Sequence, residues 1–290
     1  MTVIGTNISA MRAANASNAA SNALATSMER LSTGKSINSA KDNAAGLAIA
    51  SSMTSQIRGM NQGIRNANDG ISLAQTAEGA LDEVSNNLQR MRELTVQSQN
   101  GTYSADDKLN IDKERVALAK QIASVVNNTE FNGTKLFNGD SSAVVIQAGA
   151  TDLDQITLSV GNLKDTTAAG TGTPPTTPAG AGLALSKVID VTKTDATVLK
   201  TGTLEQYDDA IASIATTRAG LGADQNRLQS AVNNLTSNAT NLSDAKSRIE
   251  DTDFSAETTA LAKAQILSQA STAMLSQANQ SQQSVLKLLQ

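Results

Sequence analysis

The chain has 290 residues, a formal net charge of −4 at pH 7 and only 2% aromatic residues. Because Cys and His are both absent, disulfides, thiolate nucleophiles and metal sites built from these residues are excluded, and a structural protein without cofactors is favoured over an enzyme. The weak negative charge gives no electrostatic reason to expect nucleic-acid binding.

The N-terminal region combines helical spacing with very little charge. Residues 1–28 carry a single charged side chain, Arg12, and lack the basic start and apolar block of a signal peptide. No stretch approaches the roughly 20 apolar residues that a membrane span needs, so no membrane insertion is expected. Small and apolar residues recur here with alternating gaps of three and four: Val3, Thr6, Ala10, Ala13, Ser17, Ala20, Leu24, Ser27 and Leu31.

Two further helices are predicted before the middle of the chain. The first runs from about residue 44 to 99, with an apolar stripe that slips its phase once, near residue 77. Asn100-Gly101 ends it, and Ser104 with Asp107 forms the pattern that opens the next helix. The charged side chains of this next helix are interpreted as a solvated face with local ion pairs: Lys108, Lys113, Arg115 and Lys120 with Asp106, Asp107, Asp112 and Glu114.

The middle of the chain changes character. Asn-Gly pairs at 132–133 and 138–139 are turn signals, and β-rich runs follow at 144–147 and 156–160. Residues 165–182 collect Thr, Ala, Gly and all three prolines, which is typical of a linker or exposed loop. We therefore predict a β-hairpin region with a linker at the far tip of the helices.

The return path is a long helix from about residue 204 to 249. Its residues alternate gaps of four and three from Tyr207 to Ile249, and every position of the subset spaced by seven is apolar. At about 1.5 Å per residue, such a helix extends to roughly 70 Å. After it come four carboxylates, Glu250, Asp251, Asp253 and Glu257, which we expect to cap the next helix rather than hold a metal.

The C-terminal region resembles the N-terminal one. From residue 264 to 290 the only charge is Lys287. Helices of this kind are marginal alone, so both ends are interpreted as assembly segments, with loose tails as the alternative. The heptad positions here are Ala260, Ala264, Leu267, Ser271, Met274, Ala278, Ser281, Val285 and Leu288.

The predicted fold is mainly α: a long antiparallel coiled-coil-like helical rod, a small β-hairpin tip and paired terminal helices. Residues 1–40 and 255–290 are predicted to form an inner terminal-helix domain. Residues 41–140 and 200–254 are predicted to form the helical rod, and residues 141–199 the tip. Gly34-Lys35-Ser36 has the ending of a phosphate-binding loop, but Glu29 stands where that loop requires Gly.

Four separated blocks resemble bacterial flagellins. Residues 29–50, ERLSTGKSINSAKDNAAGLAIA, are similar to the N-terminal signature of that family, and residues 247–290 to its C-terminal signature. QRMRELTVQ at 89–97 resembles the long N-terminal helix, and FNGTKLF at 131–137 the turn into the β region. The similarity covers about residues 1–140 and 200–290.

The resemblance implies that copies of this one subunit build an extracellular helical filament, the filament of the bacterial flagellum. It also implies type III export without a cleaved signal, with an export chaperone and a filament cap as partners. The alternatives are a related axial protein, such as the hook–filament junction protein, and an adhesin whose binding site lies in residues 141–199. The expected filament-core packing residues are Leu24, Leu31, Leu267, Met274, Val285 and Leu288.

A second implication concerns host receptors. Residues of this chain match the family's surface for the vertebrate Toll-like receptor that senses flagellin, which also packs neighbouring subunits. Residues 29–50 resemble the epitope sensed by plant receptors, although Lys35-Ser36 and Asn43 vary from its commonest form. The expected receptor and subunit-packing surface comprises Gln89, Arg90, Glu93, Leu94 and Glu114.

Overall fold

The computed structural model describes residues 6–137, 143–151, 153–163, 181–193, 199 and 202–287. The chain divides into two compact units, which we call unit 1 (residues 1–57 and 240–290) and unit 2 (residues 58–239). The two longest helices, α2 (Ala44–Ser98) and α5 (Leu204–Glu250), contribute to both units. The predicted three-domain boundaries stay a prediction. None of the described helices carries an apolar stretch long enough to cross a membrane.

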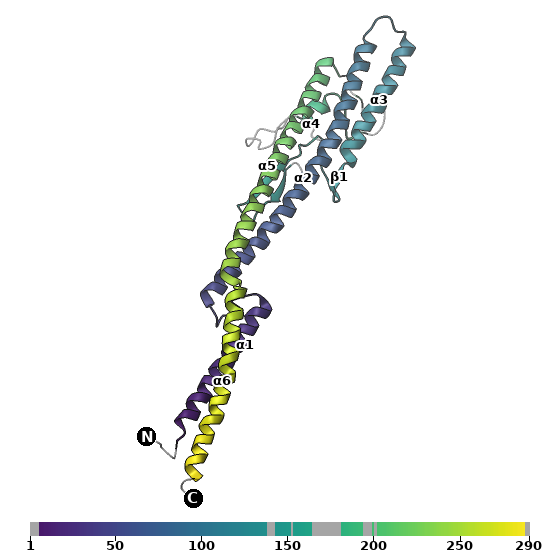
Figure 1. Cartoon of the computed structure of the whole chain (residues 1–290). Coiled ribbons are helices and arrows are strands. Elements are labelled where there is room, and N and C mark those ends of the chain that lie inside the picture. Colours follow the sequence, from purple (N-terminus) through teal and green to yellow (C-terminus); the bar gives the residue numbers. More distant parts are fainter. Residues whose placement is uncertain are drawn as a thin grey trace. The chain divides into compact units, whose positions relative to one another are not determined.

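Unit 1 is built on an antiparallel pair of helices, α1 (Ile8–Thr33) and α6 (Phe254–Lys287) (Figure 1). Asn7 caps α1, because its side-chain oxygen accepts a hydrogen bond from the Ala10 N–H at 2.9 Å. The Nδ2 of the same side chain donates to the Ala278 carbonyl at 3.1 Å. At the other end of α1, Arg30 lies 3.7 Å from Glu257. The N-terminal end of α1 therefore contacts the C-terminal part of α6, and the C-terminal end of α1 contacts the N-terminal part of α6.

The seam between α1 and α6 is made of small side chains. Small residues let two helix backbones approach closely, and a spacing of seven keeps them on one face. The members of the predicted α1 seam from residue 10 to 31 are all buried or half-buried. On α6 the half-buried positions beside the seam are Leu261, Ser268 and Leu275, one residue after the predicted 260, 267 and 274. The buried residues of the pair are Ala13, Ala20, Ser27, Ala264 and Ser271.

Three long helices with short strands along them dominate the described part of unit 2. In it, α3 (Ala105–Asn128) and parts of α2 and α5 run side by side (Figure 1). Ser104 and Asp107 form the complete capping box that the sequence predicts at the start of α3. Polar pairs show that α2 and α5 are antiparallel, since the residue numbers rise on one helix as they fall on the other. The pairs are Glu78–Gln225 at 2.9 Å, Asp82–Arg218 at 2.8 Å and Arg92–Asp208 at 2.6 Å.

The core of unit 2 follows the predicted helix stripes. Apolar side chains of α2, α3 and α5 with 0% exposure pack against one another along the unit. Burial of these apolar faces stabilises the packing of the three helices. The mainly α fold is confirmed. The fully buried side chains of these helix stripes include Ala67, Ala74, Ala77, Leu81, Val84, Leu88, Met91, Ile122, Tyr207, Ile214, Leu221 and Leu228.

Two antiparallel hairpins follow α3. The first joins β1 (Glu130–Phe131) to β2 (Thr134–Lys135) through Asn132 and Gly133, which have φ values of 49° and 78°. Two consecutive positive φ values are those of a type I′ turn, for which Asn-Gly is the preferred pair. The second hairpin pairs β3 (Ala143–Gln147) with β4 (Gln155–Ser159), close to the predicted β-rich runs.

The β3–β4 hairpin lies beside α2 rather than beyond its end. Asn66 on α2 donates its Nδ2 to the Gln147 carbonyl at 3.0 Å, and the backbone of Ala148 lies against Gly63. Leu158 and Val160 are buried in the common core. The apolar face of the hairpin is therefore buried against the side of the helices. The end of unit 2 is formed by the α2–α3 turn (Figure 1).

A short helix, α4 (Ala181–Ser186), was not expected. It begins in the predicted linker, and most of that linker lies outside the described residues. Leu185, Val188, Ile189 and Val191 are buried with Tyr207 in the core of unit 2, so the segment after the linker is part of the folded unit.

Candidate assembly and recognition surfaces

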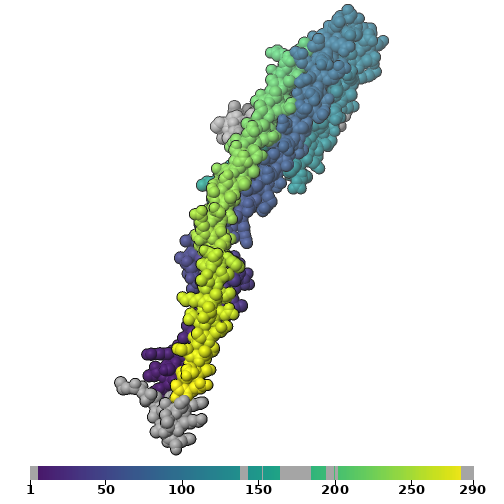
Figure 2. Space-filling model, viewed as in Figure 1, coloured from purple at the N-terminus to yellow at the C-terminus, as the bar shows by residue number. Residues whose placement is uncertain are grey.

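The outer face of the α1–α6 pair carries large apolar side chains. Ile266 and Met274 on α6 are each 66% exposed, while the buried side chains between the helices are Ala and Ser. A helix pair that buries small residues and exposes large ones has its main apolar face uncovered, and exposed apolar patches are typical of interaction sites. Figure 2 shows α6 (yellow) uncovered on the face turned to the viewer. The other exposed large apolar residues of the pair are Ile8, Met11, Met28, Phe254 and Leu267.

The predicted filament-core residues divide between these faces. Leu24 and Leu31 are half-buried on the side of α1 that meets α6. Leu267 and Met274 are exposed, on the outer face of α6. The side chain of Val285 and all of Leu288 lie outside the described residues. A role of these six residues in packing between subunits stays a prediction.

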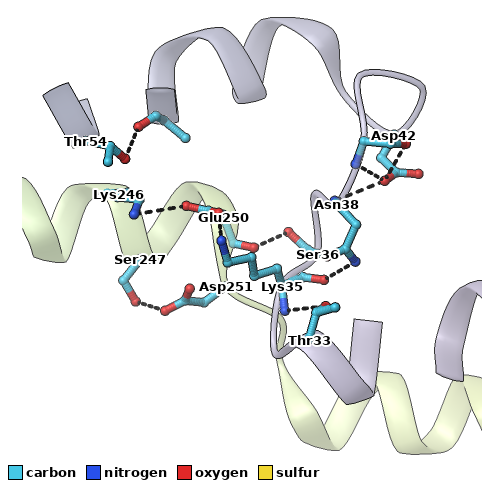
Figure 3. Close-up of polar contacts among 12 residues, drawn as sticks. Thr33, Lys35, Ser36, Asn38, Asp42, Thr54, Lys246, Ser247, Glu250 and Asp251 are labelled. Carbon is cyan, nitrogen blue, oxygen red and sulfur yellow. Dashed lines mark hydrogen bonds and ion pairs between the residues drawn. The ribbon is translucent and has the colours of Figure 1, made fainter. Parts of the chain in front are cut away.

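The link after α1 is joined to the turn between α5 and α6 (Figure 3). The Ser36 N–H donates to the Glu250 carbonyl at 2.6 Å, and the Thr252 N–H donates to the Gly34 carbonyl at 3.0 Å. Lys35 Nζ lies 2.5 Å from Glu250 Oε1. We call these contacts between residues 34–36 and 250–252 the clasp. They explain why Gly34-Lys35-Ser36 is not a phosphate loop: its backbone is paired with another part of the chain.

Charge stabilises the clasp. The side chain of Glu250 is only 9% exposed, and Lys246 Nζ lies 3.4 Å from its second oxygen. The hydrogen bond from Lys35, followed by that from Lys246, holds the pKa of the Glu250 carboxyl below its usual value. Both lysines therefore favour the charged form of Glu250.

The other carboxylates of this turn have local partners. Asp253 caps α6 as predicted, by accepting from the Ser255 and Ala256 N–H groups at 2.9 and 3.2 Å. The capping prediction is wrong for Glu250, which pairs with lysines, and for Asp251. Asp251 accepts from the Ser247 hydroxyl at 2.5 Å. Among the residues that the structure describes, no group of three or more acidic side chains is placed to hold a metal ion.

Arg90 is the centre of the predicted recognition surface on α2 and α3. Its guanidinium lies 2.9 Å from Glu114 on α3 and 3.1 Å from Glu93 one turn along α2. The hydrogen bonds that Arg90 donates, first to Glu114 and then to Glu93, raise the pKa of Arg90 above its usual value. All three side chains are about half exposed or more, so the network is available to a partner. Gln89 is exposed beside it.

Leu94 differs from the other four. The sequence places Arg90 and Leu94 four residues apart on α2, and we expected them to present one outward surface. In the structure Leu94 is 2% exposed and belongs to the interior of unit 2. The reason is geometric: Leu94 continues the buried stripe of Leu88 and Met91, while Arg90 lies at its edge. Leu94 therefore lies in the core beneath this surface.

The interpretation of all α3 charges as a solvated face is wrong for Arg115. This residue is 8% exposed, and its guanidinium donates to the Tyr207 hydroxyl on α5 at 3.1 Å and to Asp112 at 2.8 Å. The spacing of Arg115 from its apolar neighbours on α3 indicates this buried position. Arg115 lies four residues after Ile111 and seven before Ile122, both of which are buried, so it occupies a core position of α3.

Family models match most of the chain. Residues 4–142 match the bacterial flagellin N-terminal helical region, and residues 204–289 match the bacterial flagellin C-terminal helical region. The chain is 42% identical to the flagellin of Bacillus subtilis (strain 168), with 99% of each chain covered. It is 37% identical to flagellin D of Vibrio anguillarum, again with 99% of each chain covered.

One solved structure shares the fold, and another is similar over part of the chain. The chain resembles a structure described as a flagellar hook-associated protein from Vibrio parahaemolyticus, with a TM-score of 0.55 and 16% identity, covering 72% of this chain and 100% of that one. At that identity the likeness shows the fold alone. The crystal structure of Bacillus cereus flagellin is 31% identical over 63% of this chain and 94% of that one, with a TM-score of 0.46.

Proposed function

Because the chain belongs to the bacterial flagellin family and is a structural subunit of the extracellular flagellar filament, we propose that its α1–α6 pair is the surface on which copies of the chain pack together. The observation that carries this proposal is the placement of large and small side chains in unit 1. Ala13, Ala20 and Ala264 are buried between the helices, while Ile266 and Met274 are exposed. Burial of about 25 cal/mol per Å² of apolar surface favours covering the outer face, and identical copies supply matching faces.

The remaining partners follow from the same premise. We infer that the chain passes through the flagellar type III export route with a chaperone, and that it adds to the filament beneath a cap. Its role is non-enzymatic in this proposal. The absence of Cys is compatible with export as an unfolded chain, since no disulfide has to be broken.

The test is electron microscopy of the purified chain under polymerising conditions. The full chain should form long filaments. A chain lacking residues 264–290 should stay a soluble, largely helical monomer, because α6 loses most of its uncharged outer face. Filaments of normal diameter from the shortened chain would contradict the assigned surface. A full chain that forms no long filament by itself would support the hook–filament junction alternative.

A second function is favoured by the network around Arg90. We propose that this surface of the monomer is recognised by the vertebrate flagellin receptor, with Gln89, Glu93 and Glu114 around a central Arg90. Two carboxylates fix the guanidinium in one orientation, which lowers the entropic cost of binding it. Arg is common among the side chains that dominate interface energies. The plant-type epitope at residues 29–50 is a separate proposal.

Signalling by monomers tests the receptor proposal. Arg90→Asp reverses the central charge beside two carboxylates and should reduce signalling at least tenfold. Arg65→Asp is the matched control, because Arg65 is also an exposed arginine on α2, hydrogen-bonded to Gln62 on its own helix. Circular dichroism must show the same helix content in both variants. Equal signalling by the parent and the Arg90→Asp chain would rule out this surface.

A further inference from the structure

Sulfur chemistry in this chain belongs to methionine alone. There are seven Met residues and no Cys. Met91 has 0% exposure in the core of unit 2, and Met53 and Met60 are half-buried on α2. Among the residues described, the strongly exposed methionines are Met11, Met28 and Met274, at 61%, 57% and 66%. All three belong to α1 or α6.

The pairing of the helices brings two of these side chains to one level. Asn7 is hydrogen-bonded to the Ala278 carbonyl, and the helices are antiparallel. Met11 lies four residues after Asn7, and Met274 lies four residues before Ala278, so each is about one turn along the pair from that contact. Ile8, at 53% exposure, lies within the same turn as Met11. Met11 and Met274 thus lie at one level of the pair, and Met28 is exposed near the other end of α1.

We propose that Met11, Met28 and Met274 are an oxidation-sensitive set, and that their conversion to sulfoxides prevents the monomer from adding to a filament. The inference rests on the proposed packing function of the α1–α6 pair, and the partner that covers the face is a second copy of the chain. A peroxide is the oxidant. One oxygen of hydrogen peroxide is transferred to the thioether sulfur, its O–O bond breaks, the sulfur is oxidised by two electrons and water leaves.

The chemical consequence is a change of polarity on a face that must be buried. A sulfoxide carries a strong hydrogen-bond acceptor where the thioether was apolar and flexible. The α6 segment between residues 264 and 286 contains no charge, so it offers no charged donor to pair with that oxygen. An unpaired polar group is costly to bury, and the oxidised monomer should be rejected at the filament end. Methionine sulfoxide reductase reverses the modification.

The experiment uses the full chain as purified monomer. Limited hydrogen peroxide is applied, sulfoxides are located by peptide mass spectrometry, and elongation from filament seeds is timed. We expect oxidation at residues 11, 28 and 274 but not at Met91, with elongation at least tenfold slower. The variant Met11→Leu/Met28→Leu/Met274→Leu should elongate after peroxide within twofold of its untreated rate. The matched control Met53→Leu/Met60→Leu/Met91→Leu should remain as sensitive as the parent.

Two further measurements keep the proposal testable if the triple leucine variant assembles poorly. Reductase treatment should restore elongation of the oxidised parent. When assembled filaments are treated with peroxide, the same three methionines should be protected from oxidation. The proposal is overturned if oxidised parent elongates at the untreated rate, or if the three sites oxidise equally in filament and monomer. Failure of the untreated parent to elongate would instead count against the proposed packing function.

Discussion

The ammonium group of Lys35 lies 2.5 Å from the carboxylate of Glu250, although one follows the first helix and the other ends the fifth. The backbones beside them are joined as well, by the N–H groups of Ser36 and Thr252. The end of α1 and the start of α6 are therefore joined at one point in unit 1, and the two helices pair from there. A contact at this point sets where the antiparallel pair begins.

Glu250→Gln should loosen the clasp without unfolding unit 2. The amide cannot form an ion pair with Lys35 and Lys246, and loss of a charge-assisted hydrogen bond costs about 1–2 kcal/mol. We expect the Ser36 and Thr252 amides to exchange hydrogen roughly tenfold faster, since tenfold corresponds to about 1.4 kcal/mol. Asp208→Asn is a suitable control, because it removes an exposed carboxylate from the Arg92 pair in unit 2. Unchanged exchange at both amides in Glu250→Gln would show that the ion pair is dispensable.

The clasp should also respond to acid. The pKa of Glu250 is lowered by Lys35 in the folded chain, so its contribution to stability is fully present above the unfolded pKa, near 4.5. That contribution is lost as the pH falls through the lower folded pKa, because the protonated carboxyl no longer pairs with lysine. Protection factors of Ser36 and Thr252, measured from pH 7 down to pH 3, should fall only below about pH 4.5. In Glu250→Gln this acid-dependent step should disappear.

The backbone of Gly63 on α2 lies against the β3–β4 hairpin. A Cβ at this position would lie 2.9 Å from backbone atoms of Ala148 and Gly149, which cannot move without displacing the hairpin. Gly79 on the same helix has no neighbour within 4 Å of such an atom. Gly79→Ala should therefore raise stability by up to about 1 kcal/mol through helix propensity alone.

Gly63→Ala has the same gain in propensity but adds a clash. It should be less stable than Gly79→Ala by about 1–3 kcal/mol, the usual cost of overpacking. Thermal unfolding followed by circular dichroism at 222 nm measures the difference. Equal stabilisation by both substitutions would mean that the hairpin does not rest on Gly63.

The sequence predicted most of the helices because their apolar spacing is long and regular. The stripe from Tyr207 to Leu228 is buried as predicted, and Asn132-Gly133 adopts the expected turn. The α6 seam shows the limit of this approach. Spacing identifies the heptad positions but not the partner that covers each one: Leu267 is a predicted heptad position, whereas the structure exposes it and half-buries Ser268.

The exposure of the residues in the proposed recognition surface was predicted only in part for a related reason. Arg90 and Leu94 share a helical face by spacing, yet the neighbouring helices cover Leu94 and leave Arg90 at the edge. Arg115 was placed on the surface because charge outweighs spacing in a sequence argument. Its partner, the Tyr207 hydroxyl, comes from α5, far along the chain, and no local pattern connects the two.

Tyr207→Phe should destabilise unit 2, because it leaves the buried Arg115 guanidinium with one partner fewer. An unsatisfied buried donor costs about 1–3 kcal/mol, more for a charged group, and Arg115 Nε already has no partner. Tyr103→Phe removes a hydroxyl that is bonded to Gln97 at the exposed α2–α3 turn, and should change stability by less than about 0.5 kcal/mol. Urea unfolding of both variants gives the comparison. Similar midpoints for the two would show that the Arg115–Tyr207 bond contributes nothing net.

Ala20→Leu should separate α1 from α6 in the monomer. Ala20 is 5% exposed in a seam of small side chains, where extra methylene groups force the helices apart at a cost of about 1–3 kcal/mol. Ala23→Leu is the matched control, since Ala23 is exposed one turn away and Leu is almost as good a helix former as Ala. Hydrogen exchange of residues 8–33 in soluble monomer should be at least fivefold faster in Ala20→Leu than in Ala23→Leu. The same rate in both variants would show that α1 and α6 do not pack through this seam before assembly.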